Sequence, residues 1–298
     1  MRMPAAAALL AVALFLPSAA KADPTQNLSG HEPESWAMFF YQSATSFAGV
    51  GAPRHRDPWT VDAFVDLYEL PQLDAEERTV GFSGTKTEDL NKAPVFGRPG
   101  LVIGLPWDVS MWVGYIPPIE IFGVRAHLVS LAFEKPVVDD GPVTAGLRLH
   151  TQVGQVRGPY TCPENVTHFP PGSDGNPYGC NAVSNDAAIQ RTLGLELAGS
   201  YRIDALHGLA PYLSVGVNYL NGEFHVKGVE FDEPDRTRMA SDTVTFSLGS
   251  GLTMPITDRL YAGIGVFWTP LWVTRPPATH DQRDSMVQVR SELTFRLH

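Results

Sequence analysis

The sequence predicts an all-β protein, a transmembrane antiparallel β-barrel of about twelve strands, with ten as the alternative number. Three observations predict it. Many segments alternate large apolar residues with small or polar ones at period two, as strands with two different environments do. The connections alternate between short turns and long loops. The strands, at about 10 to 15 residues, also exceed the roughly 5–6 residues usual in globular proteins.

The last strand, at residues 285–298, shows the alternation most clearly. One face carries Val287, Val289, Leu293, Phe295 and Leu297, and the other carries Arg290, Glu292 and Arg296. The preceding strands share this division between large apolar residues and small or charged ones. A soluble sandwich needs its large side chains inside and many lysines outside, so we expect the large residues to face lipid and the others a polar lumen. A secreted β-sandwich is the alternative.

Ten further strands are expected on the N-terminal side of the last one. They lie at residues 259–273, 241–254, 210–220, 191–203, 143–156, 122–136, 109–116, 100–105, 78–85 and 59–70. The loop residues 220–222 (LNG) could form a hairpin turn, but the short polar segment after them favours a bulge where the strand leaves the membrane.

The segment 36–49 (WAMFFYQSATSFAG) decides between the two strand numbers. As a strand it would be the twelfth, which satisfies the even number found in bacterial single-chain barrels. As a helix it would place Trp36, Phe39, Phe40 and Phe47 roughly on one side. The barrel would then have ten strands, and one of the others would be overcounted.

The first 22 residues are expected to be a secretory signal peptide, which leaves residues 23–298 for the barrel. Arg2 precedes an apolar run that ends at Pro17, and small residues follow up to a cleavage site after Ala22. Removal of Arg2 and Lys21 leaves 20 basic and 32 acidic residues, a net charge of −12. This charge argues against nucleic acid as a partner.

The two cysteines, Cys162 and Cys180, lie in the longest loop, at residues 158–186, which is expected on the extracellular side. In an exported protein we expect them to form one disulfide. Reduced thiols or a metal pair are the alternatives. No histidines or further cysteines stand at the spacing of a zinc site, so no metal is expected.

Seven polar residues are expected to face the lumen and are the candidates for contact with a solute. They are Arg148, His150, Gln152, Glu196, Arg290, Glu292 and Arg296. The last three would line the seam where the final strand pairs with the first. His150 could act as a general base, but a buried polar ladder is the more common role for such a residue, and no catalytic residue is assigned.

Taken together, the signal peptide, the alternating strands from Gly100 onward and the closing strand resemble those of bacterial outer-membrane β-barrel proteins. This resemblance implies location in the bacterial outer membrane, with lipid and the barrel-assembly machinery as partners. In that class the last strand commonly ends in an aromatic residue. Here the alternation of Val289, Leu293, Phe295 and Leu297 is kept, but His298 is terminal.

The expected function is passage or binding of small hydrophobic or amphipathic compounds, without cofactor and without catalysis. It is motivated by lumen faces rich in Gly, Ser and Thr. One alternative is a lipid hydrolase that uses His150 or His127. The other is a structural or adhesive surface protein that acts through the loop at residues 158–186. A wide general porin is excluded, because those barrels have about 16–18 strands.

Overall fold

The structure is a computed structural model that describes residues 25–297. The expected signal peptide at residues 1–22 and the terminal His298 lie outside the described residues. The main sheet has 12 strands, of which β1 (Gln26–Asn27) and β7 (Glu120–Ile121) are bonded outside the ring. The closed ring has ten members: β2 (Val61–Glu69), β5 (Val95–Leu105), β6 (Val109–Ile116), β8 (Val124–Asp140), β9 (Val143–Gly158), β11 (Asp186–Tyr201), β12 (Ala210–His225), β15 (Arg238–Pro255), β16 (Leu260–Thr269) and β19 (Met286–Arg296).

The ring closes by antiparallel pairing at the place that the sequence predicts. β19 pairs with β2, the first strand of the ring, with Arg290 opposite Tyr68 and Glu292 opposite Asp66. On its other edge β19 pairs with β16, which pairs in turn with β15. Closure removes the free sheet edges that a membrane-spanning sheet could not leave exposed to lipid.

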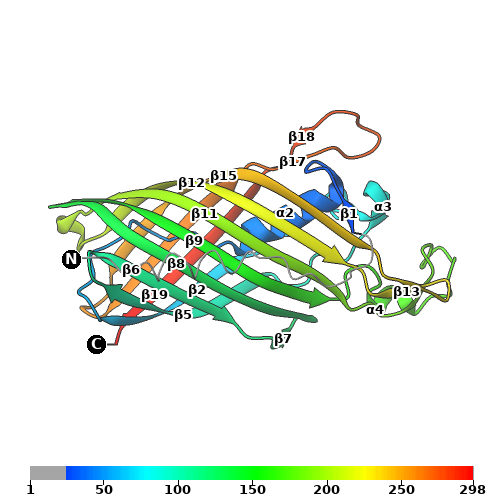
Figure 1. Ribbon diagram of the computed structural model, residues 1–298, viewed down its shortest axis with the longest axis horizontal. Coiled ribbons are helices and arrows are strands. Elements are labelled where there is room, and N and C mark those ends of the chain that lie inside the picture. Colours follow the sequence, from blue (N-terminus) through cyan, green and yellow to red (C-terminus); the bar gives the residue numbers. More distant parts are fainter. Residues whose placement is uncertain (1–24, 298) are drawn as a thin grey trace, which may run out of the picture.

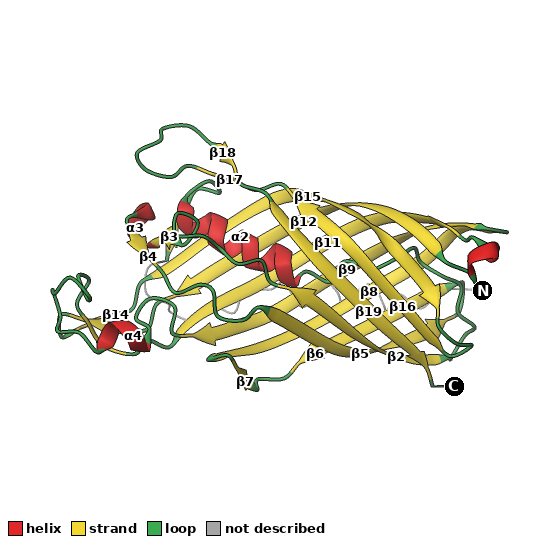
Figure 2. Cartoon of the chain, turned by 180° about the vertical axis from the view of Figure 1, so that it is seen from behind, coloured by secondary structure: helices red, strands yellow, loops and turns green. Residues whose placement is uncertain are grey.

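Short turns lie at one end of the barrel and long connections at the other (Figures 1 and 2). The turn end carries the β5–β6, β8–β9, β11–β12 and β15–β16 connections, the third with a short 3-10 helix at Asp204–Leu206. The long connections form the loop end, which holds the small elements: β3 (Thr79–Val80), α3 (Gly81–Gly84), β4 (Lys86–Thr87), α4 (Glu164–Thr167), β10 (Cys180–Ala182), β13 (Gly228–Glu230), β14 (Glu233–Asp235), β17 (Trp272–Val273) and β18 (Gln282–Arg283).

The segment that decided between twelve and ten strands is a helix, α2 (Pro33–Thr45). Pro33 occupies its first turn, where no backbone N–H is needed, and Glu34 favours the same end through the helix dipole. Residues 78–85 form no barrel strand but contain β3 and α3, the first part of the small β3–α3–β4 hairpin in the β2–β5 connection. The ring therefore has the alternative number of ten strands, and the parity stays even.

Two local expectations in the wall are decided by strand register. β12 pairs without interruption with both neighbours up to His225, so the expected bulge at residues 220–222 is wrong. On β8, whose faces the sequence did not assign, Ala126 and Leu128 are buried, and Arg125 and His127 point outward.

The outside of the barrel is an apolar band. Along each strand, exposed large residues alternate with buried inward ones. The outward set includes Leu147, Leu149, Leu195, Leu197, Val215, Val217, Val244, Phe246, Leu248, Ile264, Val266, Val289 and Leu293. In water such a surface would be an aggregation site, whereas acyl chains solvate it. Among the described residues, no helix is long and apolar enough to span a bilayer.

Candidate functional site

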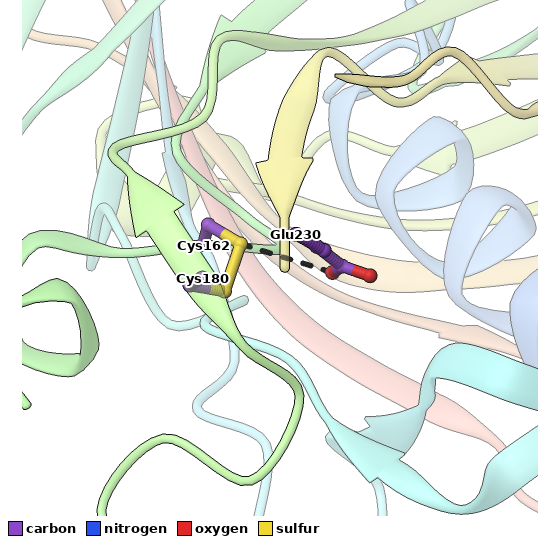
Figure 3. A group of neighbouring side chains, drawn as sticks. All are labelled: Cys162, Cys180 and Glu230. Carbon is purple, nitrogen blue, oxygen red and sulfur yellow. Dashed lines mark hydrogen bonds between the residues drawn. A yellow bond between two sulfur atoms is a disulfide. The ribbon is translucent and has the colours of Figure 1, made fainter. Parts of the chain in front are cut away.

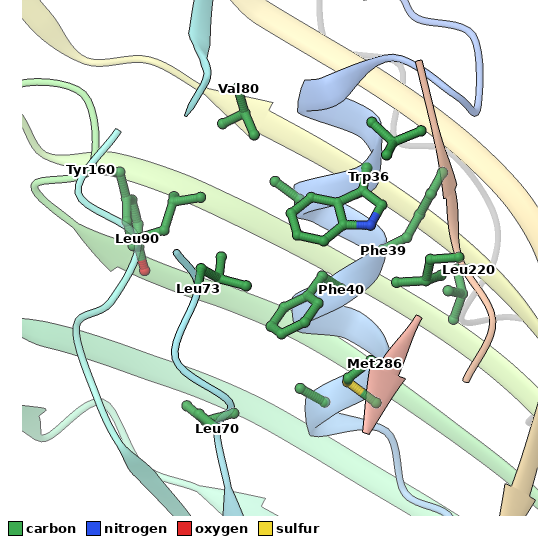
Figure 4. Close-up of a cluster of buried hydrophobic side chains, with 14 residues drawn as sticks. Trp36, Phe39, Phe40, Leu70, Leu73, Val80, Leu90, Tyr160, Leu220 and Met286 are labelled. Carbon is green, nitrogen blue, oxygen red and sulfur yellow. The ribbon is translucent and has the colours of Figure 1, made fainter. Parts of the chain in front are cut away.

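The helix α2 lies inside the lumen and fills much of its loop-side half (Figure 2). One side of the helix packs against the barrel wall and the loops, where Trp36, Phe39 and Phe40 join an apolar cluster with Leu220 and Met286 (Figure 4). After the helix, the chain continues toward the turn end and enters β2 at Val61. We call residues 33–49 the plug.

Three buried arginines from the barrel wall hold the end of the plug. Arg98 donates to the carbonyl oxygen of Thr45 at 2.5 Å, and Arg290 donates to those of Ser43 at 2.9 Å and Ser46 at 3.1 Å. Arg148 donates to the carbonyl of Phe47 at 3.2 Å. Carbonyls at a helix C-terminus have no partner within the helix and carry partial negative charge, so guanidinium groups are suited to them.

The aromatic ring of Phe47 is enclosed by two of these arginines. The guanidinium carbons of Arg98 and Arg148 lie 4.6 and 4.8 Å from its centroid, and Phe64 stacks on it at 6.0 Å. A cation over an aromatic face is attracted by the ring quadrupole, more strongly where water is excluded. Phe47 therefore joins the plug to the charged layer of the wall.

Carboxylates balance the arginines in the same layer. Glu134 forms an ion pair with Arg148, and its other oxygen accepts from the indole of Trp112 at 2.7 Å. Asp66 lies 3.8 Å from Arg98 and accepts from Tyr68 at 2.7 Å. Glu196 accepts from the backbone N–H of Gly49 at 3.1 Å. Breaking one partner of such a buried set leaves an uncompensated charge, which costs about 3–5 kcal/mol.

Six of the seven predicted lumen residues are buried in or beside this layer. They are Arg148, His150, Gln152, Glu196, Arg290 and Glu292. Arg296 lies at the turn end, where its side chain is half exposed and 4.0 Å from Asp62. The structure thus brings most of the predicted set together around the plug. None of the seven lines the cavity at the loop end of the barrel.

That cavity, of about 330 Å³, lies between the plug and the loop end of the barrel. Its wall is mainly apolar and comes from α2, from six strands of the ring and from the loops. The principal lining side chains are Met38, Tyr41, Leu90, Phe96, Val124, Ala126, Val156, Tyr160, Ile189 and Phe224. A concave, mostly apolar site with few polar groups is the usual form of a small-molecule site.

One side of the cavity carries charge. Lys86 is buried and lies 3.2 Å from Glu230 and 3.5 Å from Glu88, beside the stacked rings of Phe82 and Tyr178. Burial, with Asp186 and Glu230 acting in the same direction, raises the pKa of the Glu88 carboxyl from 4.5 to about 8, although Lys86 opposes the change. At neutral pH the three side chains together are therefore close to neutral.

We expect the loop end to become less stable as the pH rises, because folding raises the pKa of Glu88. The folded state holds this proton more tightly, so the stabilisation is complete below about pH 4.5 and is lost as the pH passes about 8. After division by trypsin's own activity in each buffer, limited digestion of the loops should be faster at pH 9 than at pH 6. Glu88→Gln, digested in the same buffers, should remove most of the difference, and an equal acceleration in that variant would contradict the assignment.

The predicted disulfide between Cys162 and Cys180 is present and ties the long loop beside the charged side of the cavity. Figure 3 shows both cysteines next to Glu230, whose Oε1 lies 3.8 Å from Sγ of Cys162. These three residues come close enough together to suggest a metal site. Because the sulfurs are bonded to each other, they cannot act as thiolate ligands in this state.

The two histidines considered for a hydrolase point to opposite faces of the wall. His150 is buried in the lumen, and its Nδ1 has no hydrogen-bond partner among the described residues. His127 points outward, with its ring against Tyr115 at 5.7 Å. Neither lines the cavity.

Sequence reasoning missed the cavity, although one signal was visible. The segment 122–136 shows apolar residues on both faces, which is unexpected beside a polar lumen. Its inward residues near the loop end, Val124 and Ala126, line the cavity. The contributions of α2 and of the β2–β5 loop left no comparable signal.

The closed ring, the apolar band, the even strand number and the sorting of turns and loops are the properties of one class of protein. The chain is an outer-membrane β-barrel. In this class the short turns face the periplasm and the long loops the outside, and this orientation stays a prediction for the chain.

Comparison with known proteins finds similarity only in fold. No protein-family model and no curated protein matches the sequence. The translocator domain of autotransporter NalP from Neisseria meningitidis is 12% identical, covers 90% of this chain and 99% of that chain, and has a TM-score of 0.41. Outer membrane protease OmpT from Escherichia coli is 9% identical, with 80% and 94% covered and a TM-score of 0.36.

The toluene transporter TbuX from Ralstonia pickettii is 8% identical, with 86% of this chain and 97% of that chain covered and a TM-score of 0.33. Likeness at these identities and scores carries no argument about what this chain binds.

Proposed function

We propose that this barrel binds a small apolar or amphipathic compound in the cavity above its plug, on the extracellular side of the outer membrane. The observation that carries the proposal is the cavity itself, about 330 Å³ with a mainly apolar wall. An apolar cavity of this size gains free energy by taking an apolar molecule out of water, at roughly 25 cal/mol per Å² of apolar surface buried.

The charged group at the side of the cavity favours an amphipathic compound. Lys86 and Glu230 form a pair within reach of the lining, and Glu88 is protonated near neutral pH. These side chains can donate to or accept from one polar group on a ligand whose remaining surface is apolar. A strongly charged solute would find no uncompensated partner there.

Passage of the compound into the periplasm would require the plug to move. The carbonyls of Ser43, Thr45, Ser46 and Phe47 are bonded to the wall arginines below the cavity. In the conformation described, the lumen route is therefore closed at this layer. Binding, as the first step of uptake, is the part of the expected function that the geometry supports.

Binding can be tested with the fluorescent probe N-phenyl-1-naphthylamine and the barrel in lipid nanodiscs, which avoid competition by detergent. We expect saturable binding, and a loss of at least about tenfold in affinity, or 1.4 kcal/mol, with Ala188→Trp. Ala188 lines the cavity on β11, so a bulky side chain there fills it.

The matched control is Leu195→Trp, which introduces the same side chain on the lipid-facing side of the same strand. It should bind the probe like the wild type. Binding that Ala188→Trp leaves unchanged, or that both variants weaken equally, would contradict the proposed site.

A further inference from the structure

Strand pairing in the barrel wall is interrupted between β5 and β6 at the loop end. β5 pairs with β2 from Ile103 opposite Val61 up to Val95 opposite Glu69. On its other edge the pairing with β6 stops at Gly100, opposite Gly114. The stretch from Val95 to Pro99 therefore has a partner on one side only among the described residues.

The sequence explains why the pairing stops there. Pro99 has no N–H for a ladder bond, and β6 ends at Ile116 immediately before Pro117 and Pro118. Two successive prolines cannot continue a sheet ladder. The chain instead forms β7, which bonds to β8 and not to β5. Figures 1 and 2 show β7 at the margin of the barrel.

Apolar side chains close this interruption from the inside. Ile116, Ala126 and Leu128 form a buried cluster, and Phe96 of β5 packs against it from across the interruption. Side-chain packing of this kind can open without breaking a hydrogen-bonded ladder. β15 also extends beyond its ladder with β16, from Arg238 to Ser247, but there β1 pairs with Met239 and Ala240.

The cavity lies directly behind this cluster, because Phe96, Val124 and Ala126 line it. The other boundaries of the cavity are less suited to the entry of an apolar solute. The floor is the plug, with the charged layer beneath it, and the loop-side boundary includes polar residues such as Lys86, Glu230 and Asp235. Just outside the interruption, Ile119, Ile121 and Phe122 are 63%, 56% and 59% exposed, an apolar surface suited to the boundary of a lipid leaflet.

We infer that the interruption between β5 and β6 is a lateral gate through which the compound exchanges between the cavity and the outer leaflet of the membrane, with Phe96 as its movable side chain. The inference rests on the proposed function, since it names the route to the same cavity. The compound taken is then one that dissolves in lipid, such as a hydrocarbon or a single-chain amphiphile, and not one collected from water.

The test measures entry of membrane-dissolved probe into the cavity. Barrels in phosphatidylcholine vesicles are mixed rapidly with vesicles that carry N-phenyl-1-naphthylamine, and energy transfer from tryptophan to the probe is followed. Phe96→Ala removes the closing ring and should accelerate entry at least about fivefold. Phe96→Leu, a smaller truncation, is the second variant should the first fail to fold, as judged by heat-modifiable gel migration.

The comparison variant is Phe224→Ala, which truncates another aromatic residue of the cavity on β12, away from the interruption. It should alter equilibrium affinity and leave the entry rate within about twofold of the wild type. Equal acceleration by both variants, or none with either Phe96 variant, would overturn the gate. Because equilibrium binding is measured separately, loss of all binding in the wild type would instead count against the proposed function.

Discussion

Removal of residues 25–49 is expected to turn the closed barrel into an ion-conducting channel. These residues contain β1 and the plug, the only backbone segment among the described residues that enters the lumen as a helix. Without them, Arg98, Arg148 and Arg290 lose their carbonyl partners and become hydrated. In planar bilayers the wild type should show no discrete steps in ionic current. The truncated barrel should add one current step with every barrel that inserts.

The control is a deletion of residues 169–175 at the tip of the disulfide loop, which leaves the lumen unchanged and should leave the barrel closed. Folding of each variant is checked by heat-modifiable gel migration. A truncated barrel that folds and still does not conduct would show that the wall side chains, together with residues 50–56 that lie against Trp112 and Glu134, close the lumen without the plug.

Phe47→Ala should destabilise the barrel by about 3–5 kcal/mol, the usual cost of removing a buried Phe. The ring is fully buried and contacts Arg98, Arg148 and Phe64. Its loss creates a void and removes two cation–π contacts in a layer where water is largely excluded. The free energy of unfolding can be obtained from urea titrations of the barrel in lipid vesicles.

Phe246→Ala is the matched control for this measurement. Phe246 lies on the outside of β15 and contacts lipid, so its truncation leaves no internal void. We expect Phe246→Ala to lower the free energy of unfolding by much less than Phe47→Ala does. An equal decrease in the free energy of unfolding in the two variants would mean that Phe47 contributes only buried apolar area and does not bind the plug to the barrel wall.

The conductance expected of the truncated barrel and the destabilisation expected of Phe47→Ala have a common structural origin. Phe47 lies in the part of the plug that the arginines hold, so its truncation should also loosen the plug in the barrel. We expect brief conducting steps with Phe47→Ala, at a frequency between those of the wild type and the truncated barrel.

The side of the sheet to which each side chain points could be read from the sequence, because it is a local property of a strand. Successive side chains point to opposite sides, so parity alone predicts that Arg148, His150 and Gln152 share one face, and all three are buried. The order of the strands followed from the sorting of turns and loops, and the disulfide from two cysteines in one loop. None of these inferences needs a contact between distant parts of the chain.

The helix α2 illustrates where local reasoning ends. Its apolar residues fit period two and period 3.6 about equally well over so short a segment. The lumen decided between them, because a helix satisfies its own backbone there and presents Trp36, Phe39 and Phe40 to the wall. The strand number of ten followed from that choice.

The sequence by itself determined that this chain closes into a barrel with lipid outside, where that barrel turns and which side chains enter the lumen. Only the tertiary structure decided what those side chains hold and where a ligand can lie. Arg148 bonds to Phe47, 101 residues away, and the cavity wall combines α2, several strands and the loops. The direction in which side chains point repeats every two residues along a strand, whereas these contacts depend on how separate segments pack inside one enclosed volume.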